Sequence, residues 1–335
     1  IDTPGHVDFS GEVERVVNMA DGCLLVVDAV DGPMPQTRYV LKVAMESGLK
    51  PVVVINKIDR SVDQVKATVD AVNDLFLDLA TESEQLDFPV LFASAKEGYA
   101  VPDLESDPVD MEPLFEAILN YIPAPEADLD GGLQMLVAAL DYDNHLGQIA
   151  VGRVFRGMMR KGEALVLMGE DGSLAPCRAE HIFSFRDLVR HEVAEVVGGD
   201  IVAVSGAKGV KIGDTLASQS CPEALDRIHI QEPTVKMTFA VNSSPFSGKD
   251  GKYATSRSLW ERLQKELQTN VSLRVGRTES ADEFIVSGRG ELHLSVLIEN
   301  MRREGLEFQV SKPEAITREI DGRTFEPYER ITVDT

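Results

Sequence analysis

Three short polar segments hold the residues of this sequence that could do chemistry. Residues 2–6 place a carboxylate, a hydroxyl, a proline-set turn, a glycine and an imidazole side by side. Carboxylates hold hard cations, and an imidazole can orient or exchange protons near neutral pH. Residues 56–59 (Asn-Lys-Ile-Asp) and 94–96 (Ser-Ala-Lys) add amide, ammonium, carboxylate and hydroxyl groups. Each segment alone is common by chance, so its value depends on whether the fold brings all three together.

Apolar runs predict the strands that would position these segments. Residues 23–28, 51–56 and 89–94 are almost unbroken apolar runs, which suits the strands of a parallel sheet covered on both faces. Residue 2 is predicted to follow another strand, of which only the end is present. Helical patterns lie between and after the runs, at about 36–48, 62–79 and 113–122. We therefore predict an α/β doubly wound domain, in which ligands bind at the carboxyl ends of the strands.

In this order and at these strand ends, the three segments resemble the third, fourth and fifth motifs of the GTPase family. The resemblance implies that Asp59 accepts two hydrogen bonds from guanine, which adenine cannot donate. It implies that Asn56 contacts the base and braces the loops, and that the Lys57 stem lies along the ring. The remaining residues of the implied guanine site are Ile58, Ser94, Ala95 and Lys96.

The same resemblance assigns phosphate chemistry to the first segment. Asp2 would hold Mg²⁺, through water, because Mg²⁺ sheds its hydration reluctantly. The Gly5 amide would sense the γ-phosphate, since glycine allows the backbone to approach closely. His6 directly after Asp-Thr-Pro-Gly is similar to the translational GTPases, in which a histidine orients the attacking water. Residues 7–20 would form the switch II helix, and the implied cofactors are GTP or GDP and Mg²⁺.

One expected element is missing from the sequence. No GxxxxGK[ST] segment occurs in the 335 residues, and such a segment supplies the backbone nest and the lysine for the phosphates. The chain starts without Met and within a predicted strand, so we expect it to be truncated at both ends. We predict that these residues alone bind guanine nucleotide poorly and hydrolyse none.

Two further domains are predicted after residues 1–125. Turn-rich residues 123–132 lead into short, glycine-punctuated strands, which predict a β-barrel over 126–229 with a hairpin turn at 170–172. Residues 230–320 read strand, helix, strand, strand, helix, strand, the ferredoxin-like split βαβ plan. Residues 321–335 would begin another domain. The predicted class is thus a multidomain α/β + β + α+β protein: a partial P-loop GTPase-type sheet, a translation-factor barrel and a ferredoxin-like domain.

Charge and cysteine content limit the partners. The net charge of −23 falls mostly in the first third and argues against nucleic acid there. Later basic residues leave two readings open, contact with ribosomal RNA or a solvated surface: Arg153, Arg156, Arg160, Lys161, Arg302 and Arg303. Cys23, Cys177 and Cys221 are unpaired in pattern, so we expect buried thiols, no disulfide partner and a reducing compartment. No apolar run approaches membrane-spanning length.

Across its length the sequence is most similar to the TypA/BipA family of the elongation-factor-G group. The similarity rests on residues 31–38, 241–249 and 288–302. It implies a cytoplasmic, monomeric, ribosome-binding GTPase that acts in stress response, virulence and ribosome assembly. An elongation-factor-G-like or release-factor GTPase is the alternative. For the residues present, a docking module that binds the ribosome without hydrolysing GTP is a second alternative.

Overall fold

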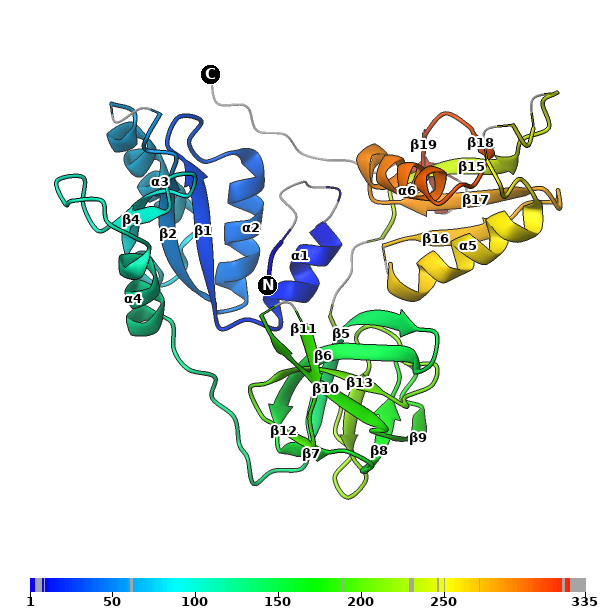
Figure 1. Ribbon diagram of the computed structural model, residues 1–335, viewed down its shortest axis with the longest axis horizontal. Coiled ribbons are helices and arrows are strands. Elements are labelled where there is room, and N and C mark those ends of the chain that lie inside the picture. The colour runs from blue at the N-terminus through cyan, green and yellow to red at the C-terminus, as the bar shows by residue number, and fades with distance from the viewer. Residues whose placement is uncertain are drawn as a thin grey trace.

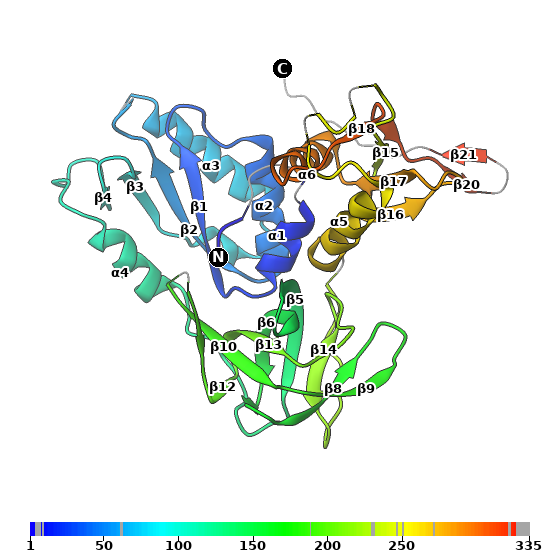
Figure 2. The same cartoon turned by 45° about the vertical axis from the view of Figure 1, so that its right-hand side comes forward.

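Three folded bodies surround one short helix, α1 (Ser10–Val17). The computed structural model describes residues 1–3, 8, 10–60, 63–187, 189–228, 232–245, 247–249, 251–270, 272–320 and 323–325. In Figures 1 and 2, α1 lies between the first domain, the barrel below it and the third domain. The predicted order of α/β, β and α+β domains is confirmed.

The first domain contains a four-stranded sheet in the order β1-β2-β3-β4. Its strands are β1 (Gly22–Asp28), β2 (Lys50–Asn56), β3 (Val90–Ser94) and β4 (Tyr99–Val101). The first three run parallel, as predicted, so their carboxyl ends lie at one edge. β4 pairs antiparallel with β3 and was not predicted, because three residues are too few to show a pattern.

Helices cover both faces of this sheet. α2 (Pro35–Glu46) and α3 (Val65–Leu79) share one core with Val53 and Ile55, and α4 (Glu112–Tyr121) covers Val52 and Val54 on the other face. Neighbouring residues of β2 are buried on opposite faces of the sheet, which explains why its sequence is continuously apolar. A short 3₁₀ helix, Ser83–Leu86, follows α3.

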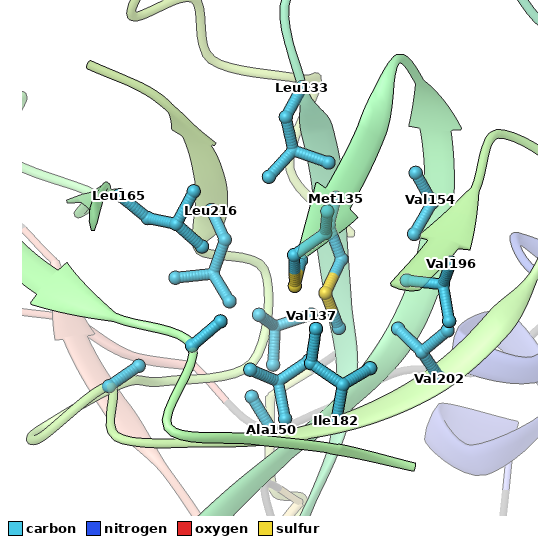
Figure 3. Packing of buried hydrophobic residues seen from close by; sticks show 14 of the residues in the cluster. Leu133, Met135, Val137, Ala150, Val154, Leu165, Ile182, Val196, Val202 and Leu216 are labelled. Atoms are coloured by element: carbon cyan, nitrogen blue, oxygen red, sulfur yellow. The ribbon is translucent and has the colours of Figure 1, made fainter. Parts of the chain in front are cut away.

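The second body is an antiparallel β-barrel whose eight-stranded sheet runs β11-β10-β13-β6-β5-β14-β8-β9. The predicted hairpin at 170–172 is confirmed, with Gly172 in the left-handed region at φ +75°. Figure 3 shows the apolar interior, to which Met135 and Val137 contribute. The strands are β5 (Gln134–Asp143), β6 (Gly147–Arg156), β7 (Met158–Arg160), β8 (Ala164–Met168), β9 (Leu174–Arg178), β10 (His181–Arg186), β11 (Val189–Glu192), β12 (Glu195–Val197), β13 (Ile201–Ser205) and β14 (Thr215–Ser218).

The third domain has the predicted split βαβ order. The sheet order is β16-β17-β15-β18, and β19 also pairs with β15. Both helices contribute to one core, through Leu263 of α5 and Leu297 of α6. Its elements are β15 (Val235–Val241), α5 (Ser256–Thr269), β16 (Arg274–Arg277), β17 (Glu283–Gly288), α6 (Glu291–Arg303), β18 (Phe308–Val310) and β19 (Glu314–Ala315), followed by the hairpin β20 (Arg318–Ile320) and β21 (Arg323–Phe325). Of residues 321–335, which are predicted to begin another domain, only 323–325 are among the described residues.

The cysteines are less buried than their sequence pattern predicts. Cys221 is exposed and Cys23 and Cys177 are only partly buried, so the prediction of three buried thiols was wrong. Burial nevertheless raises the pKa of Cys23 to about 11. Within the described ranges, no helix combines the length and apolarity needed to cross a bilayer.

α1 joins the first domain to the barrel by burying two different sides. Val13 and Val17 pack with α2, whereas Met19, just after the helix, packs with Leu136 and Ala138 of β5. β5 is therefore buried on both faces, because its alternate residues Met135 and Val137 point into the barrel. Burial of this apolar surface holds the two domains together.

An ion pair lies beside this apolar contact. Arg153 of β6 places its Nη2 2.7 Å from Oδ1 of Asp21, in the turn between α1 and β1. The Arg153 side chain is 8% exposed and that of Asp21 31% exposed. The Arg153 Nε is buried and has no hydrogen-bond partner among the described residues, so the guanidinium depends on Asp21 as its counter-ion.

The two partners should therefore respond unequally to substitution. Asp21→Ala leaves a buried guanidinium unpaired and should lower the free energy of unfolding by about 3 kcal/mol. Arg153→Met leaves a carboxylate that water can reach and should cost about 1 kcal/mol. Urea denaturation followed by circular dichroism measures both, with exposed Asp107→Ala as the control. Equal losses for the two variants would contradict this asymmetry.

Candidate functional site

The three parallel strands bring their terminal polar residues to one edge of the sheet. Asp28 at the end of β1 lies beside Asn56 at the end of β2 in the strand register, and Asn56 pairs with Ala93 of β3. Ser94 is the last residue of β3. Segments 56–59 and 94–96, which are far apart in the chain, therefore meet at one place.

Asn56 connects the two loops that form this edge. Its Oδ1 accepts hydrogen bonds from the backbone N–H of Ala95 at 3.0 Å and of Lys57 at 2.8 Å. Lys57 has φ +65°, a conformation that costs energy for a residue with a side chain. The Asn56 amide helps to hold the backbone in that conformation and fixes the second loop to the first.

Asp59 is presented to solvent with one oxygen held in place. The Oγ of fully buried Ser94 donates to Asp59 Oδ1 at 2.8 Å. Asp59 is exposed, and an ionised carboxylate has further acceptor positions to which two donors on a planar ring could bind. Ala95 and Lys96 are exposed next to it.

Ile58 differs from the other predicted guanine-site residues. Its side chain is 7% exposed and packs in the core with Leu25 and Val65. Its backbone N–H donates to the Ala93 carbonyl at 3.3 Å. The side chain therefore anchors the loop between Lys57 and Asp59 and does not reach a ligand at this edge.

Asp28 belongs to the site and was missed in the sequence. Its Oδ2 lies 2.5 Å from Lys57 Nζ, and its Oδ1 accepts from the Val30 backbone N–H at 2.9 Å. The hydrogen bond from Lys57, followed by that from Val30, lowers the pKa of Asp28. The sequence feature that could have indicated Asp28 is its position at the end of an apolar run. Asn56 and Ser94 each end an apolar run in the same way.

The predicted phosphate-side residues are only partly described. Asp2 is exposed, and residues 1–3 form no regular secondary structure, so the strand expected there is not seen. Gly5 and His6 lie outside the described residues. In the described part of the chain, no group of three or more His, Cys, Asp or Glu side chains could hold a metal. A single carboxylate such as Asp2 still suits Mg²⁺, which keeps several waters and shares phosphate oxygens.

The basic residues singled out in the sequence are already paired with acids. Arg156 pairs with Glu223, Arg160 with Glu195 and Lys161 with Glu192, while Arg153 is buried against Asp21. Each acid comes from a distant part of the sequence, so the four basic side chains are neutralised separately, and the two readings of this stretch, RNA contact or a solvated surface, stay predictions. Arg302 and Arg303 of α6 likewise bind Glu299, whose pKa falls to about 2 owing first to the Arg302 hydrogen bond.

Comparison with known families covers all three bodies. Residues 1–124 match the elongation factor Tu GTP binding domain, residues 147–217 match elongation factor Tu domain 2, and residues 250–312 match elongation factor G domain III. These matches follow the same order as the three domains of the structure. They identify the polar sheet edge as part of a GTP-binding domain.

Similar proteins match the whole length of the chain. Proteins named large ribosomal subunit assembly factor BipA are 51% identical in Synechocystis sp. and 52% identical in Bacillus subtilis and Escherichia coli K12, each over 334 residues. The matches cover 100% of this chain, 56% of the Synechocystis protein and 55% of the other two. The chain thus spans about half the length of these relatives.

A solved structure supports the fold independently. The crystal structure of a protein from Thermus thermophilus superimposes with a TM-score of 0.66 and covers 96% of this chain and 60% of its own. Sequence identity is 20%, so the likeness concerns the fold alone.

The Asp28–Lys57 pair generates a pH prediction. Because the folded-state pKa of Asp28 is depressed, the stability that it contributes is present above its ordinary value of 3.8 and is lost as pH falls through the folded value. Lys57→Met should raise the Asp28 pKa toward 3.8, whereas Lys66→Met on the exposed face of α3 should leave it unchanged. Carboxyl ¹³C NMR titration measures the Asp28 pKa. An unchanged value in Lys57→Met would show that Lys57 does not cause the depression.

Proposed function

Because this chain belongs to the translational GTPase family, in its TypA/BipA group, we propose that the protein binds and hydrolyses GTP at the carboxyl ends of β1, β2 and β3. The observation that carries the proposal is the Asn56 amide joined to Ala95 beside an Asp59 carboxylate oriented by Ser94. These hydrogen bonds bring the two guanine motifs of the sequence into one site.

Guanine recognition follows from the chemistry of this edge. The further acceptor positions of Asp59 receive the ring N–H and amino group of guanine, and the backbone near Ser94 and Ala95 contacts the guanine oxygen. Adenine lacks the two donors and would leave the carboxylate desolvated and unpaired, which costs several kcal/mol. Lys57, held by Asp28, lays its aliphatic stem along the ring.

Hydrolysis is assigned to the residues before α1. Asp2 would hold Mg²⁺ through water, and the ion would neutralise charge that develops on the phosphates. The Gly5 amide contacts the γ-phosphate. His6 orients the attacking water, and binding of the ribosome is what seats its ring. These three roles rest on the family resemblance and on the position of Asp2.

Phosphate binding needs more than these residues provide. The 335 residues contain no GxxxxGK[ST] segment, which cradles the β-phosphate and supplies a lysine. We therefore infer that the chain alone binds guanine nucleotide weakly and does not turn it over. Titration of the chain with a fluorescent GTP analogue tests this, and micromolar affinity would overturn it.

We further propose that the protein acts on the ribosome, in assembly of its large subunit. Support comes from the BipA relatives, which are 51–52% identical over the whole chain. This identity favours the TypA/BipA group over elongation factor G or a release factor. Roles in stress response and virulence, a cytoplasmic location and a monomeric state rest on the resemblance alone. The acid-paired arginines of the barrel do not favour the alternative of a simple RNA-docking module.

Replacing Asp59 should change the base preference from guanine to xanthine. In a protein that joins this chain to a GxxxxGK[ST] segment, Asp59→Asn should weaken GTP binding about a thousandfold, because one acceptor oxygen is replaced by an NH2 group that opposes the amino group of guanine. The new amide can donate to the second carbonyl of xanthine, so affinity for xanthosine triphosphate should rise. Competition titration measures both. Asp63→Asn, at an exposed position nearby, is the control; unchanged base preference in Asp59→Asn would refute the site.

A further inference from the structure

Helix α6 of the third domain begins without a cap of its own. The first N–H groups of a helix have no partner within it and need one from outside. The residue at the N-cap position is Gly290, which has no side chain to offer. By contrast, α5 of the same domain is capped locally, since Thr255 Oγ1 accepts from the Ser258 N–H at 3.2 Å.

The cap for α6 comes from the first domain. Asp8 Oδ2 accepts a hydrogen bond from the Leu292 N–H at 2.9 Å and a longer one from the His293 N–H at 3.4 Å. Asp8 is separated from these residues by more than 280 positions and lies two residues before α1. A carboxylate at this end also interacts favourably with the helix dipole.

Gly290 is a glycine because Asp8 is so close. Its φ of −162° is extended backbone that any residue adopts, so conformation does not require glycine. A Cβ atom at this position would overlap the carboxylate of Asp8, well inside contact distance. Any side chain at position 290 would therefore push the Asp8 carboxylate out of the helix end.

One side of this contact is buried, at His293. Its side chain is 4% exposed, and its Nε2 is 2.9 Å from the Asn270 Nδ2. Burial lowers the pKa of His293, and the nearby Asp8 carboxylate opposes that effect. The hydrogen bond from the His293 N–H to Asp8 is therefore partly buried, whereas the one from the Leu292 N–H is exposed to solvent.

We propose that Asp8 is a positioning residue for GTP hydrolysis, which ties the start of α1 to the N-terminus of α6. The proposal rests on the proposed function. Asp8 stands between Asp2 and α1 in the chain, and α1 is held on its other sides by α2 and β5. With the cap in place, Asp8 and α1 are fixed relative to all three domains, and through them the third domain contributes to the geometry of the phosphate site.

Two substitutions separate the contact of Asp8 with the α6 N-terminus, here called the tether, from the stability of α6 itself. Asp8→Ala removes both the tether and the cap. Gly290→Ser displaces Asp8 but supplies a hydroxyl that caps α6 in its place, because serine is among the preferred N-cap residues. Asp8→Asn keeps a carbonyl oxygen that can accept the same hydrogen bonds. Gly276→Ser is the matched control, since a Cβ at Gly276 meets no atom within 4 Å.

The first measurement uses this chain and needs no nucleotide. In amide hydrogen exchange, Asp8→Ala should accelerate exchange of Leu292 and His293 and of α1 about fivefold, as expected for the loss of one cap. Gly290→Ser should accelerate amide exchange in α1 by a similar factor, but the amides of Leu292 and His293 should stay protected. Unchanged exchange of α1 in both variants would overturn the tether.

The second measurement tests hydrolysis in a protein that joins the chain to a GxxxxGK[ST] segment. Asp8→Ala and Gly290→Ser should each lower kcat of ribosome-stimulated GTP turnover about tenfold or more with KM for GTP unchanged, because misplacement acts on the chemical step. Asp8→Asn should recover most of the rate, and Gly276→Ser should match the unsubstituted protein. A full rate in Gly290→Ser would overturn the positioning role.

The two measurements also separate this inference from the proposed function. Absence of GTP turnover in the unsubstituted protein contradicts the proposed function and, with it, the positioning role in hydrolysis. The exchange measurement still decides whether Asp8 connects α1 to α6. Accelerated α1 exchange together with a tenfold lower kcat supports both.

Discussion

The structure depends on the burial of α1 between domains. A helix of eight residues is too short to persist alone, since isolated helices under about 12 residues are marginal in water. It is formed here because Val13 and Val17 are covered by α2, and because the turn that follows packs Met19 on the barrel. The same contact buries the outer face of β5. Removing α1 would expose apolar surface on two domains at once.

The two parts of the proposed nucleotide site are held in different ways. The residues of the guanine site are fixed within the first domain, by hydrogen bonds among strand ends and by the Asp28–Lys57 pair. The segment that begins at Asp2 has few such local bonds in the described structure. Its neighbours in the chain are instead held by the barrel and by α6. Under the proposed function, base recognition would depend on one domain, and phosphate chemistry would depend on contacts with all three.

Charge is organised in pairs at the joints and on the later domains. The chain carries a net charge of −23, yet its buried guanidinium at Arg153 has a carboxylate partner in another domain. Arginines that are close in sequence, such as Arg156 and Arg160, point to separate acids. A cluster of basic residues in a sequence therefore does not by itself predict a basic surface. Acidic residues that are distant in the sequence can lie beside the cluster in the folded sheet and neutralise it.

The sequence by itself determined the elements and the chemistry of the guanine edge. Continuous apolar runs predicted parallel strands, and polar residues at their ends predicted where Asn56, Asp59 and Ser94 would meet, because both patterns are local. Tertiary structure alone decided which side chains meet across long separations. Asp28 on Lys57, Asp21 on Arg153 and the Asp8 cap of α6 each depend on how elements pack, and no periodicity records that. The chemistry of the first segment, residues 2–6, could be inferred from its residue types, but the anchorage of the neighbouring Asp8 and α1 to three domains could not.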